Sequence, residues 1–452
     1  MNNYPLHLKE RLFSLIDDMA SVSWLYCMNP GRDFTRVKKI SFSDTMKFIL
    51  AMEGSTVDKE LVDYFLARDP DPSRCPSQSA FNQRRSHIKY EAFQQLFLDF
   101  SSCCPRNSSF DQYQILAVDG SNVVYATDPD NVDDYVTYET RNGYNYNQLH
   151  LDAFFDILNG IFVDAVVQHG VKYDERKAMH DMIDHFETPD PSHTIITADR
   201  GYESYDLIAH LREKGLRFVL RAKDYTTPSS LLAFYKEEYP DSPEFDVTIK
   251  RFISNSKDRE ILDNPSIYKY VKPAKDLPHI KFREESGLYY LQFRVVRIEI
   301  REGVYECLIT NLPAWEFPKE KLKDIYHLRW GIETAFCQLK YSVSMAAFHA
   351  KKVEYIKQEI YARLSLFNFS KSVSSHASVS KNKRKKYKHA YKINFNMAVH
   401  ICRLFLKRSC DMHPLDVIGW IQQYLRVEKE PGRSFLRNLR GIGAVSFFYR
   451  LS

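Results

Sequence analysis

Hydrophobic residues recur at helical spacing through the first hundred residues of the chain. Leu8, Leu12, Leu15 and Met19 form one apolar stripe of an amphipathic helix. Further helical periods cover residues 43–52, 58–66 and 77–97, and Ser77 is a suitable capping residue for the last of these. We therefore expect a helical region over residues 1–110.

The pattern changes between residues 114 and 221, where short apolar runs alternate with helical periods. The apolar runs predict strands, and the hairpin signal Asn159-Gly160 joins two of them. The predicted strands are 114–124, 149–158, 161–168, 194–198 and 217–221, with helices at 175–186 and 204–214. Three early strands followed by helix, strand, helix and strand are the element order of a ribonuclease H-like α/β sheet, so residues 111–221 are expected to form the first part of such a core.

The helical period disappears again from residue 222 to 315. Strand-like runs at 245–252, 288–300 and 305–312 indicate a β-rich insertion inside the α/β domain. Helical spacing returns over 316–370, which we expect to complete the core. Residues 371–452 are predicted to be a basic helical region, with a lysine-rich run at 381–392 followed by helices at 394–406 and 414–425.

Composition places the chain among globular proteins and leaves several partners open. Its 452 residues predict two to three domains, and 44% hydrophobic with 27% charged residues fit a soluble protein. A net charge of +5 permits a polyanionic partner without requiring one. The eight cysteines show no zinc-site spacing, which favours a reducing compartment. No signal peptide or membrane span is recognised, so an intracellular, cytoplasmic protein is expected.

Two aspartates follow apolar strands in the same way. Asp119 follows the run Ile115–Val118 and precedes a glycine, and Asp199 follows Thr194–Ala198 with a glycine two positions on. If the two strands are neighbours, both carboxylates lie at one edge of the sheet. A lone strand-end aspartate is more often a turn or capping residue than a catalytic one. Together with Glu333, however, they form a set of three acids able to hold two Mg²⁺ ions.

Glu333 lies in a predicted helix whose polar residues share one face. Tyr326, Arg329, Glu333 and Lys340 fall within roughly a 60° sector if every residue turns the helix by about 100°. A carboxylate for metal, flanked by a phenol and two cations for phosphate, suits phosphodiester chemistry. The alternative is a solvated face with Arg329 and Glu333 as an ordinary i,i+4 ion pair.

Other acidic and basic residues have less specific interpretations. Asp152, Asp156 and Asp164 lie on the predicted strands as rival acids, and for Asp164 a structural partner is favoured over a metal. The acidic run 128–134 is predicted to be a solvated loop, and His349 is expected to be a surface or packing residue.

Two segments are candidates for DNA contact. The helix beginning at Ser77 follows another helix and a proline-containing turn, which is compatible with a helix-turn-helix reader. Its predicted base or phosphate contacts are Gln78, Asn82, Arg84 and Arg85. The lysine-rich run, with Lys385 and Lys386 at its centre, is predicted to contact phosphates non-specifically, and a solvated linker or localisation signal is the alternative.

These residues resemble the signature of a known enzyme family. The spacing Y-x2-R-x3-E-x6-K at Tyr326, Arg329, Glu333 and Lys340 resembles that of DDE transposases of the insertion-sequence-four family. The Asp119-Gly120 pair resembles the block around that family's first aspartate. The segment Asp199–Tyr202 resembles the block around its second, and either Tyr202 or Tyr205 is the equivalent aromatic residue. The resemblance covers about residues 115–365.

The resemblance implies cut-and-paste DNA transposition. Asp119, Asp199 and Glu333 would be the catalytic metal ligands for Mg²⁺, which Mn²⁺ can replace. Tyr326, Arg329 and Lys340, with Arg200 beside the second aspartate, would hold the DNA end. The partners implied are double-stranded DNA, as transposon ends with terminal inverted repeats and as target, and a second copy of the chain in a homodimeric synaptic complex. Nucleoid association is expected, and no membrane.

Two other functions remain open from the residues alone. One is a ribonuclease H-like nuclease or resolvase that cleaves DNA without strand transfer. The other is a DNA-binding protein descended from a transposase and no longer catalytic, which three intact acidic positions disfavour.

Overall fold

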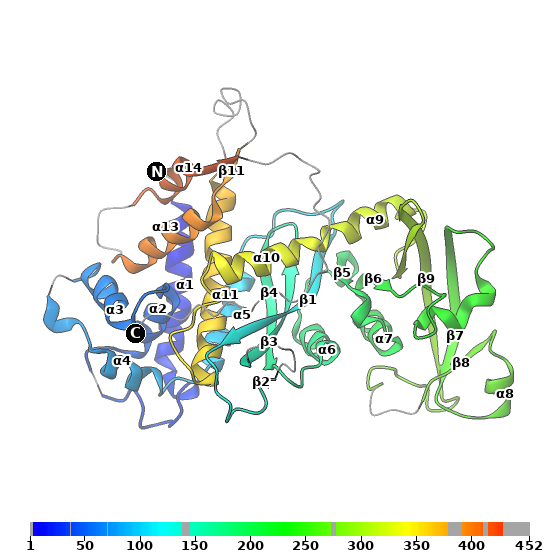
Figure 1. Ribbon diagram of the computed structural model, residues 1–452, viewed down its shortest axis with the longest axis horizontal. Coiled ribbons are helices and arrows are strands. Elements are labelled where there is room, and N and C mark those ends of the chain that lie inside the picture. The colour runs from blue at the N-terminus through cyan, green and yellow to red at the C-terminus, as the bar shows by residue number, and fades with distance from the viewer. Residues whose placement is uncertain are drawn as a thin grey trace.

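A ten-stranded mixed sheet forms the centre of the molecule, with helices on both faces and a helical bundle at one end. The computed structural model describes residues 3–36, 38–69, 71–137, 145–272, 277–377, 391–409 and 415–427. Figure 1 shows α1, α11 and α13 gathered at one end, β1–β6 in the middle, and β7–β9 at the other end. The predicted mixed α/β class is confirmed.

The sheet has the strand order β2-β3-β1-β5-β6-β10-β9-β7-β8. β4 pairs with the part of β3 that lies beyond its pairing with β2. β3 (Tyr146–Asp156) is antiparallel to β1 (Gln114–Tyr125) and β4 (Ile161–His169), whereas β5 (Thr194–Ala198) is parallel to β1 and to β6 (Arg217–Ala222). Helices α6 (Glu175–His185) and α7 (Tyr205–Glu213) connect the parallel strands. All seven predicted elements between 114 and 221 are therefore confirmed, and most of their ends lie within two residues of the predicted positions. Gly160 takes the positive φ of +70° that the hairpin turn requires.

The segment predicted to be a β-rich insertion is rich in strands, but it continues the central sheet. β10 (Val304–Thr310) pairs antiparallel with β6, and β9 (Leu288–Arg301) and β7 (Phe245–Ser254) follow. The short β8 (Tyr268–Tyr270) forms the edge, with α8 (Arg259–Asp263) and the 3₁₀ segment η5 (Leu231–Glu238) beside these strands. The apolar run in β9 thus extends the hydrogen-bonded ladder of the core rather than forming a separate sheet.

The amino-terminal and carboxy-terminal helices form one bundle. α1 (Tyr4–Ser21), α2 (Phe42–Ala51) and α5 (Glu91–Cys103) pack against α11 (Val353–His376) and α13 (Phe395–Lys407) in a single hydrophobic core. Buried cations join the two regions: Lys9 donates to the carbonyl of Phe405 at 2.9 Å, and Arg363 donates to the carbonyl of Glu53 at 3.0 Å. Regions at opposite ends of the sequence therefore stabilise each other.

The predicted helix over residues 77–97 was wrong as one element. The structure has α4 (Gln78–Arg85) and α5, separated by residues 86–90, of which Ile88 forms an isolated bridge with Cys27. Ser77 caps α4, as predicted, by accepting a hydrogen bond from the Ala80 amide. The remaining elements are α3 (Val57–Leu66), α14 (Val417–Gln423), β2 (Tyr135–Val136), β11 (Tyr391–Ile393), β12 (Leu425–Val427), η1 (Ser23–Leu25), η2 (Pro72–Arg74), η3 (Pro191–His193) and η4 (Arg200–Tyr202).

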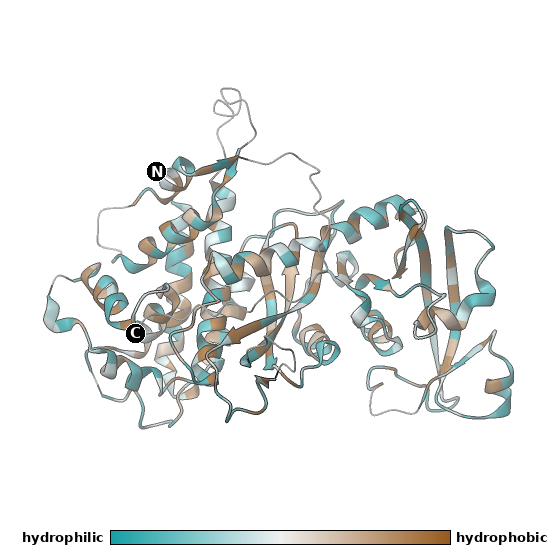
Figure 2. Ribbon diagram, in the orientation of Figure 1, coloured by the Kyte–Doolittle hydropathy of each residue, from teal (hydrophilic) through white to brown (hydrophobic). Residues whose placement is uncertain are grey.

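Successive residues of the central strands pack on opposite faces of the sheet, because side chains alternate along a strand. Ala117 belongs to the core shared with α10 (Trp330–Tyr341) and α11, whereas its neighbours Leu116 and Val118 belong to the core shared with α6 and α7. Figure 2 shows hydrophobic strands in the sheet and a largely hydrophilic α9 (Lys319–Leu328) at its edge. In the described part of the chain, no helix has the length and apolar character needed to cross a membrane.

Candidate active site

The first two predicted acids lie side by side at one edge of the sheet. β1 and β5 are parallel and in register, with Ala117 opposite Thr197, so Asp119 and Asp199 each follow two residues later. β1 does not end at Asp119 but continues to Tyr125 by pairing with β3, in agreement with the predicted strand 114–124. Its pairing with β5 nevertheless stops at Ala117, which opens the sheet edge at the two carboxylates.

The third acid reaches the same edge from the joint between α9 and α10. Arg329 lies at that joint, where its amide donates to the Tyr326 carbonyl at 3.1 Å in a tight turn, so the single helix expected from the sequence is two. The buried Arg329 guanidinium lies 3.4 Å from Asp119 Oδ2 and 3.2 Å from Glu333 Oε1. The Tyr326 hydroxyl donates to Asp199 Oδ1 at 3.3 Å. Arg329 therefore contacts two of the three predicted acids, Asp119 and Glu333, and Tyr326 contacts the third, Asp199.

Lys340 does not reach this group. It lies near the end of α10, half-buried, and burial lowers the pKa of its ammonium group. The break at Arg329 divides the predicted helix, so Tyr326 lies on α9 whereas Glu333 and Lys340 lie on α10. No ion pair or hydrogen bond links Lys340 to the three acids in the described residues.

The two aspartates have different ionisation properties. Burial raises the pKa of Asp119 to about 6, and the neighbouring Glu333 and Glu175 carboxylates act in the same direction against the opposing charge of Arg329. Burial also acts on Asp199, but the hydrogen bond from the Arg200 amide and the charges of Arg329 and Arg221 outweigh it and lower its pKa. Asp119 therefore keeps its proton to higher pH than Asp199 does.

A basic cavity adjoins Asp199 and contains residues that sequence reasoning missed. Arg221, on β6, lies 3.4 Å from Asp199 Oδ1 and 3.0 Å from Glu306 on β10. A cavity of about 360 Å³ is lined there by Arg200, Arg221, Lys223, Glu306 and six neighbours. Arg200 is exposed at its edge, as a DNA contact requires. Arg221 closes a predicted strand, but only the pairing of β6 with β10 brings Glu306 beside it.

The structure distinguishes the two tyrosines that follow Asp199. Tyr202 is buried, and its hydroxyl has no hydrogen-bond partner among the described residues. Its pKa is raised by burial and by the charges of Asp152, Glu175 and Asp119. Tyr205 instead shares a hydrogen bond of 2.9 Å with the Tyr235 hydroxyl in the core. Tyr202 is therefore the aromatic residue that faces the acids.

A further group of polar residues lies next to Asp119 along the sheet. His150 Nε2 lies 3.4 Å from Asp152 Oδ1 and 3.3 Å from Glu175 Oε1. These two carboxylates outweigh the effect of burial and raise the pKa of His150 to about 9. A side chain on Gly120 would collide with His150 Nε2 at 2.3 Å, so the glycine after Asp119 makes room for this histidine. Sequence reasoning missed His150 and Glu175 because neither belongs to a local motif.

The remaining rival acids have structural surroundings. Asp156 accepts hydrogen bonds from Gln114 and Asn159. Asp164 accepts one from the Ala165 amide, and burial raises its pKa to about 7. The solvated-loop prediction was wrong for Asp134, which is fully buried and binds the Tyr125 hydroxyl, His169 and the Gly170 amide.

The predicted DNA-reading helix keeps only part of its candidate surface. Gln78 and Asn82 are exposed one turn apart on α4. Arg84 donates to the Ile40 carbonyl at 3.1 Å and stacks on Phe34. The prediction for Arg85 was wrong, because it is buried and forms an ion pair of 3.1 Å with Glu359. Lys385 and Lys386 lie outside the described residues.

His349, expected to be a surface or packing residue, is buried between two acids. It lies 3.1 Å from Glu60 and 3.2 Å from Glu359. This cluster joins α3 to α11 and belongs to the helical bundle rather than to the site.

The donor set at the sheet edge fits a divalent cation that prefers oxygen ligands. Asp119, Asp199 and Glu333 are each partly exposed, and a bound cation would stabilise the ionised form of Asp119, which burial disfavours. The unpartnered Tyr202 hydroxyl and Arg329 Nε atom lie buried in the same place. In the described residues, the three carboxylates do not converge on one point as closely as the ligand atoms of a preformed metal cluster.

Comparison with known proteins agrees with this arrangement. The chain matches the family described as Transposase DDE domain over residues 111–369, more than half its length. It is 42% identical over 72 residues to the transposase of insertion sequence element IS421 from Escherichia coli, a segment covering 16% of this chain and 19% of that protein. The chain is also 42% identical over 72 residues to the putative transposase InsL of insertion sequence element IS186A from Escherichia coli K12. That segment covers 20% of the InsL protein.

A solved structure, the piggyBac transposase synaptic complex with hairpin DNA, was also found. The alignment covers 95% of this chain and 87% of the piggyBac chain, at 13% sequence identity. Its TM-score of 0.40 is too low to establish a shared fold. The family match spans every residue of the carboxylate site, from Asp119 through Asp199 to Glu333. The chain belongs to the transposase DDE domain family.

Proposed function

We propose that the protein is a DNA transposase of an insertion sequence, acting by cut-and-paste through a ribonuclease H-like core. The observation that carries this proposal is the meeting of Asp119, Asp199 and Glu333 at one sheet edge beneath Arg329 and Tyr326. The strand order β4-β3-β1-β5-β6, with only β3 antiparallel to the other four, supports the ribonuclease H-like core. The contact of Tyr326 with Asp199 and those of Arg329 with Asp119 and Glu333 support the insertion-sequence-four signature.

The three carboxylates would hold Mg²⁺, or Mn²⁺ in its place, and two ions are proposed for the site. When bound, the cation supplies a nucleophile and neutralises the charge that develops on the phosphate. Arg329 holds Asp119 and Glu333 at a fixed separation through its planar guanidinium. Tyr326 orients the Asp199 carboxylate by a hydrogen bond, so each acid has one protein group that sets its direction.

The DNA end is proposed to follow the basic cavity beside Asp199. Arg200, Arg221 and Lys223 line it, and cations at such a place bind the phosphate backbone without reading sequence. The exposed Gln78 and Asn82 on α4 are proposed to read bases of the terminal repeats, since amide side chains pair with adenine in the major groove. Lys340 and the lysines at 385 and 386 are proposed to contact DNA away from the acids.

Several wider features belong to the same proposal. Residues 1–110 form the DNA-binding part, the catalytic core comprises 111–221 and 316–370, 222–315 is an insertion, and 371–452 is a basic carboxy-terminal region. A homodimer in a synaptic complex and a cytoplasmic, nucleoid-associated location complete it.

The test uses the full chain, Mg²⁺ and DNA bearing the flanks of its own gene, with a second duplex as target. We expect 3′-OH ends that join to the target, and a loss of both steps of about 10³-fold or more in Asp119→Asn, Asp199→Asn and Glu333→Gln, since each change removes a charge at the reacting phosphate. Hydrolysis without joining would identify a nuclease. Sequence-specific binding without either step would identify a DNA-binding protein descended from a transposase. Cleavage that survives all three substitutions would overturn the assignment of the site.

A further inference from the structure

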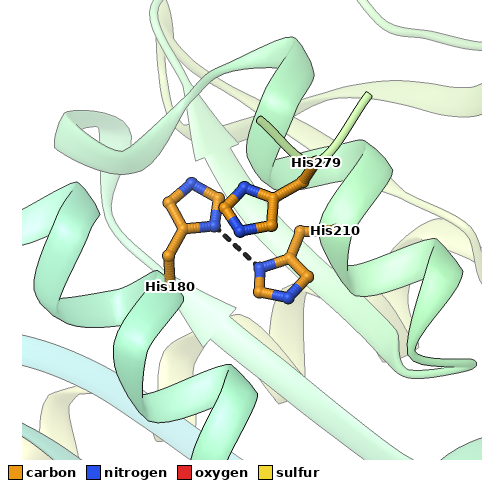
Figure 3. A group of neighbouring side chains, drawn as sticks. All are labelled: His180, His210 and His279. Carbon is orange, nitrogen blue, oxygen red and sulfur yellow. Dashed lines mark hydrogen bonds between the residues drawn. The ribbon is translucent and has the colours of Figure 1, made fainter. Parts of the chain in front are cut away.

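Three histidines from separate parts of the chain meet on the side of the sheet covered by α6 and α7. His180 lies in the middle of α6, His210 near the end of α7, and His279 just before Ile280 in the segment that leads to β9. One ring nitrogen from each lies within 4.8 Å of those of the other two (Figure 3). None of the three takes part in the carboxylate site described above.

The rings are arranged as a pair with a third ring above them. His180 Nδ1 and His210 Nδ1 are 2.8 Å apart, so one donates a hydrogen bond to the other. The His279 ring stacks on both, at 4.1 Å from the His180 centroid and 3.9 Å from that of His210. In Figure 3 one nitrogen of His279 is turned toward the line that joins the two Nδ1 atoms.

One nitrogen of each ring, here called the outer nitrogen, lies beside the carboxylate of Asp206 or Asp184. Asp206 Oδ2 lies 2.8 Å from His279 Nδ1 and 3.4 Å from His180 Nε2, and Asp184 Oδ1 lies 3.1 Å from His210 Nε2. The inner atoms are then His180 Nδ1, His210 Nδ1 and His279 Nε2, the last of which also lies 4.0 Å from Asp184 Oδ2. A carboxylate on the outer nitrogen is the usual companion of a metal-ligating histidine, because it fixes the tautomer and makes the other nitrogen a better donor.

Charge also favours a cation at this place. Burial lowers the pKa of His180 to about 4, and burial together with the charge of His279 lowers the pKa of His210. Asp206 is almost fully buried and Asp184 half-exposed, and together they supply two negative charges. Lys214, which binds Asp184 at 2.9 Å, is the one cation paired to the cluster among the described residues.

We propose that His180, His210 and His279 form a second metal site, for a transition-metal ion of the zinc class, separate from the carboxylate site. Imidazole nitrogens prefer Zn²⁺, Co²⁺ and Ni²⁺, whereas Mg²⁺ prefers oxygen. In a tetrahedral site with bonds of about 2.0–2.1 Å the ligand nitrogens lie farther apart than 2.8 Å, so the ion replaces the shared proton and separates the His180–His210 pair. The rings are now nearly parallel, and binding turns them toward the common point.

Such an ion would fasten the strand-rich segment to the catalytic core. His279 belongs to the chain entering β9, while α6 and α7 flank β5, the strand that precedes Asp199. The Asp206 carboxylate already ties the His279 amide and ring to α7 at 2.9 and 2.8 Å. A metal bond would reinforce this attachment without touching the reacting groups.

The test measures metal binding by the full chain, purified without a nickel column and treated with chelator. Co²⁺ is titrated into the Asp119→Asn variant, which weakens binding at the carboxylates, and its visible absorption is followed. We expect one equivalent of Co²⁺ in a tetrahedral spectrum that Zn²⁺ displaces, and its loss in Asp119→Asn/His279→Ala. Asp206→Asn should weaken binding by about 10–100-fold, because it removes the orienting carboxylate.

His7→Ala, at an exposed histidine, is the matched control and should bind as the parent does. Circular dichroism and the melting temperature without metal show whether each variant is folded, and His279→Gln replaces His279→Ala if it is not. The melting temperature of the parent should rise with Zn²⁺ and that of the His279 variants should not. The proposal fails if folded parent binds no Co²⁺, if His279 variants bind it equally, or if binding disappears in His150→Ala instead.

Discussion

Arg329 and Arg85 are both buried arginines that the sequence assigned to DNA, and the structure gives them opposite surroundings. Arg85 is 2% exposed and donates to Gln358 at 2.9 Å, to the Tyr355 carbonyl at 2.7 Å and to Glu359 at 3.1 Å, all on or beside α11. Arg329 is 3% exposed, but its contacts are longer, its Nε atom has no partner, and its acids are partly open to solvent.

The comparison shows that burial of a cation does not by itself reveal its role. Arg85 is satisfied by partners that are themselves buried, so it completes the packing between α4 and α11. Arg329 holds together carboxylates that repel each other and that are partly open to solvent. The exposure of the partners, rather than of the arginine, separates a structural cation from a positioning one.

The largest effect expected is on stability, at Arg85. Arg85→Ala leaves the buried Glu359 without this partner and should lower the free energy of unfolding by about 3–5 kcal/mol. Urea unfolding followed by circular dichroism measures it. Arg74→Ala, at an exposed ion pair of 3.3 Å, is the control and should cost about 0–1 kcal/mol. Equal losses in the two variants would contradict the structural role of Arg85.

Arg329→Ala should act on catalysis more than on folding. The substitution removes the cation between Asp119 and Glu333, so we expect DNA cleavage to fall by about 10²–10³-fold, the usual effect of deleting one electrostatic stabiliser. Single-turnover cleavage at saturating Mg²⁺ measures it. Lys323→Ala, on the exposed side of α9, is the matched control. A loss of stability like that of Arg85→Ala, with normal cleavage by the folded fraction, would reverse the comparison.

The ionisation of Asp119 makes the contribution of the Arg329 region to stability depend on pH. Its pKa in the folded protein is about 6 against an ordinary value of 3.8, so the native state binds more protons than the unfolded state between these values. The contribution of Asp119 to stability is therefore full below about pH 4 and is lost as pH rises through about 6, by roughly 3 kcal/mol at most.

Thermal unfolding of metal-free protein between pH 4 and 8, compared with Asp119→Asn, isolates this contribution. Excess Mg²⁺ should reduce the loss at high pH, and cleavage should increase through about pH 6 as the carboxylate becomes free to bind metal. A difference between the two proteins that does not change with pH would show that Asp119 has an ordinary pKa.

The smallest effects are expected on α4, beside the buried Arg85. Gln78→Ala and Asn82→Ala should each weaken binding to the terminal repeats by about 1–3 kcal/mol, since each removes a possible base contact, with little change for unrelated DNA. Electrophoretic mobility shifts at fixed salt measure the ratio. Equal weakening for both DNAs would indicate phosphate contacts, and no change would remove α4 from the interface.

Local chemistry explains what could be predicted from the sequence. Apolar runs bounded by turn residues located β1, β5 and β6. Asp119 and Asp199 meet because each follows its apolar run and β1 and β5 are parallel neighbours in register. The spacing from Tyr326 to Glu333 survived the break at Arg329 because these residues lie within two turns of it. Lys340 lies seven residues beyond Glu333, near the end of α10, and among the described residues no ion pair or hydrogen bond joins it to the acids.

What the sequence alone determined is the set of elements, their order through the core and the three acids, because backbone preference and hydrophobic period act between near neighbours. Only the tertiary structure decided that Arg85 is buried against Glu359, that Glu306 lies beside Arg221, that Tyr202 faces the acids, and that His180, His210 and His279 meet. Each of these depends on side chains brought together from distant segments, and the free energy of burying a charge or a ring is set by those partners rather than by adjacent residues.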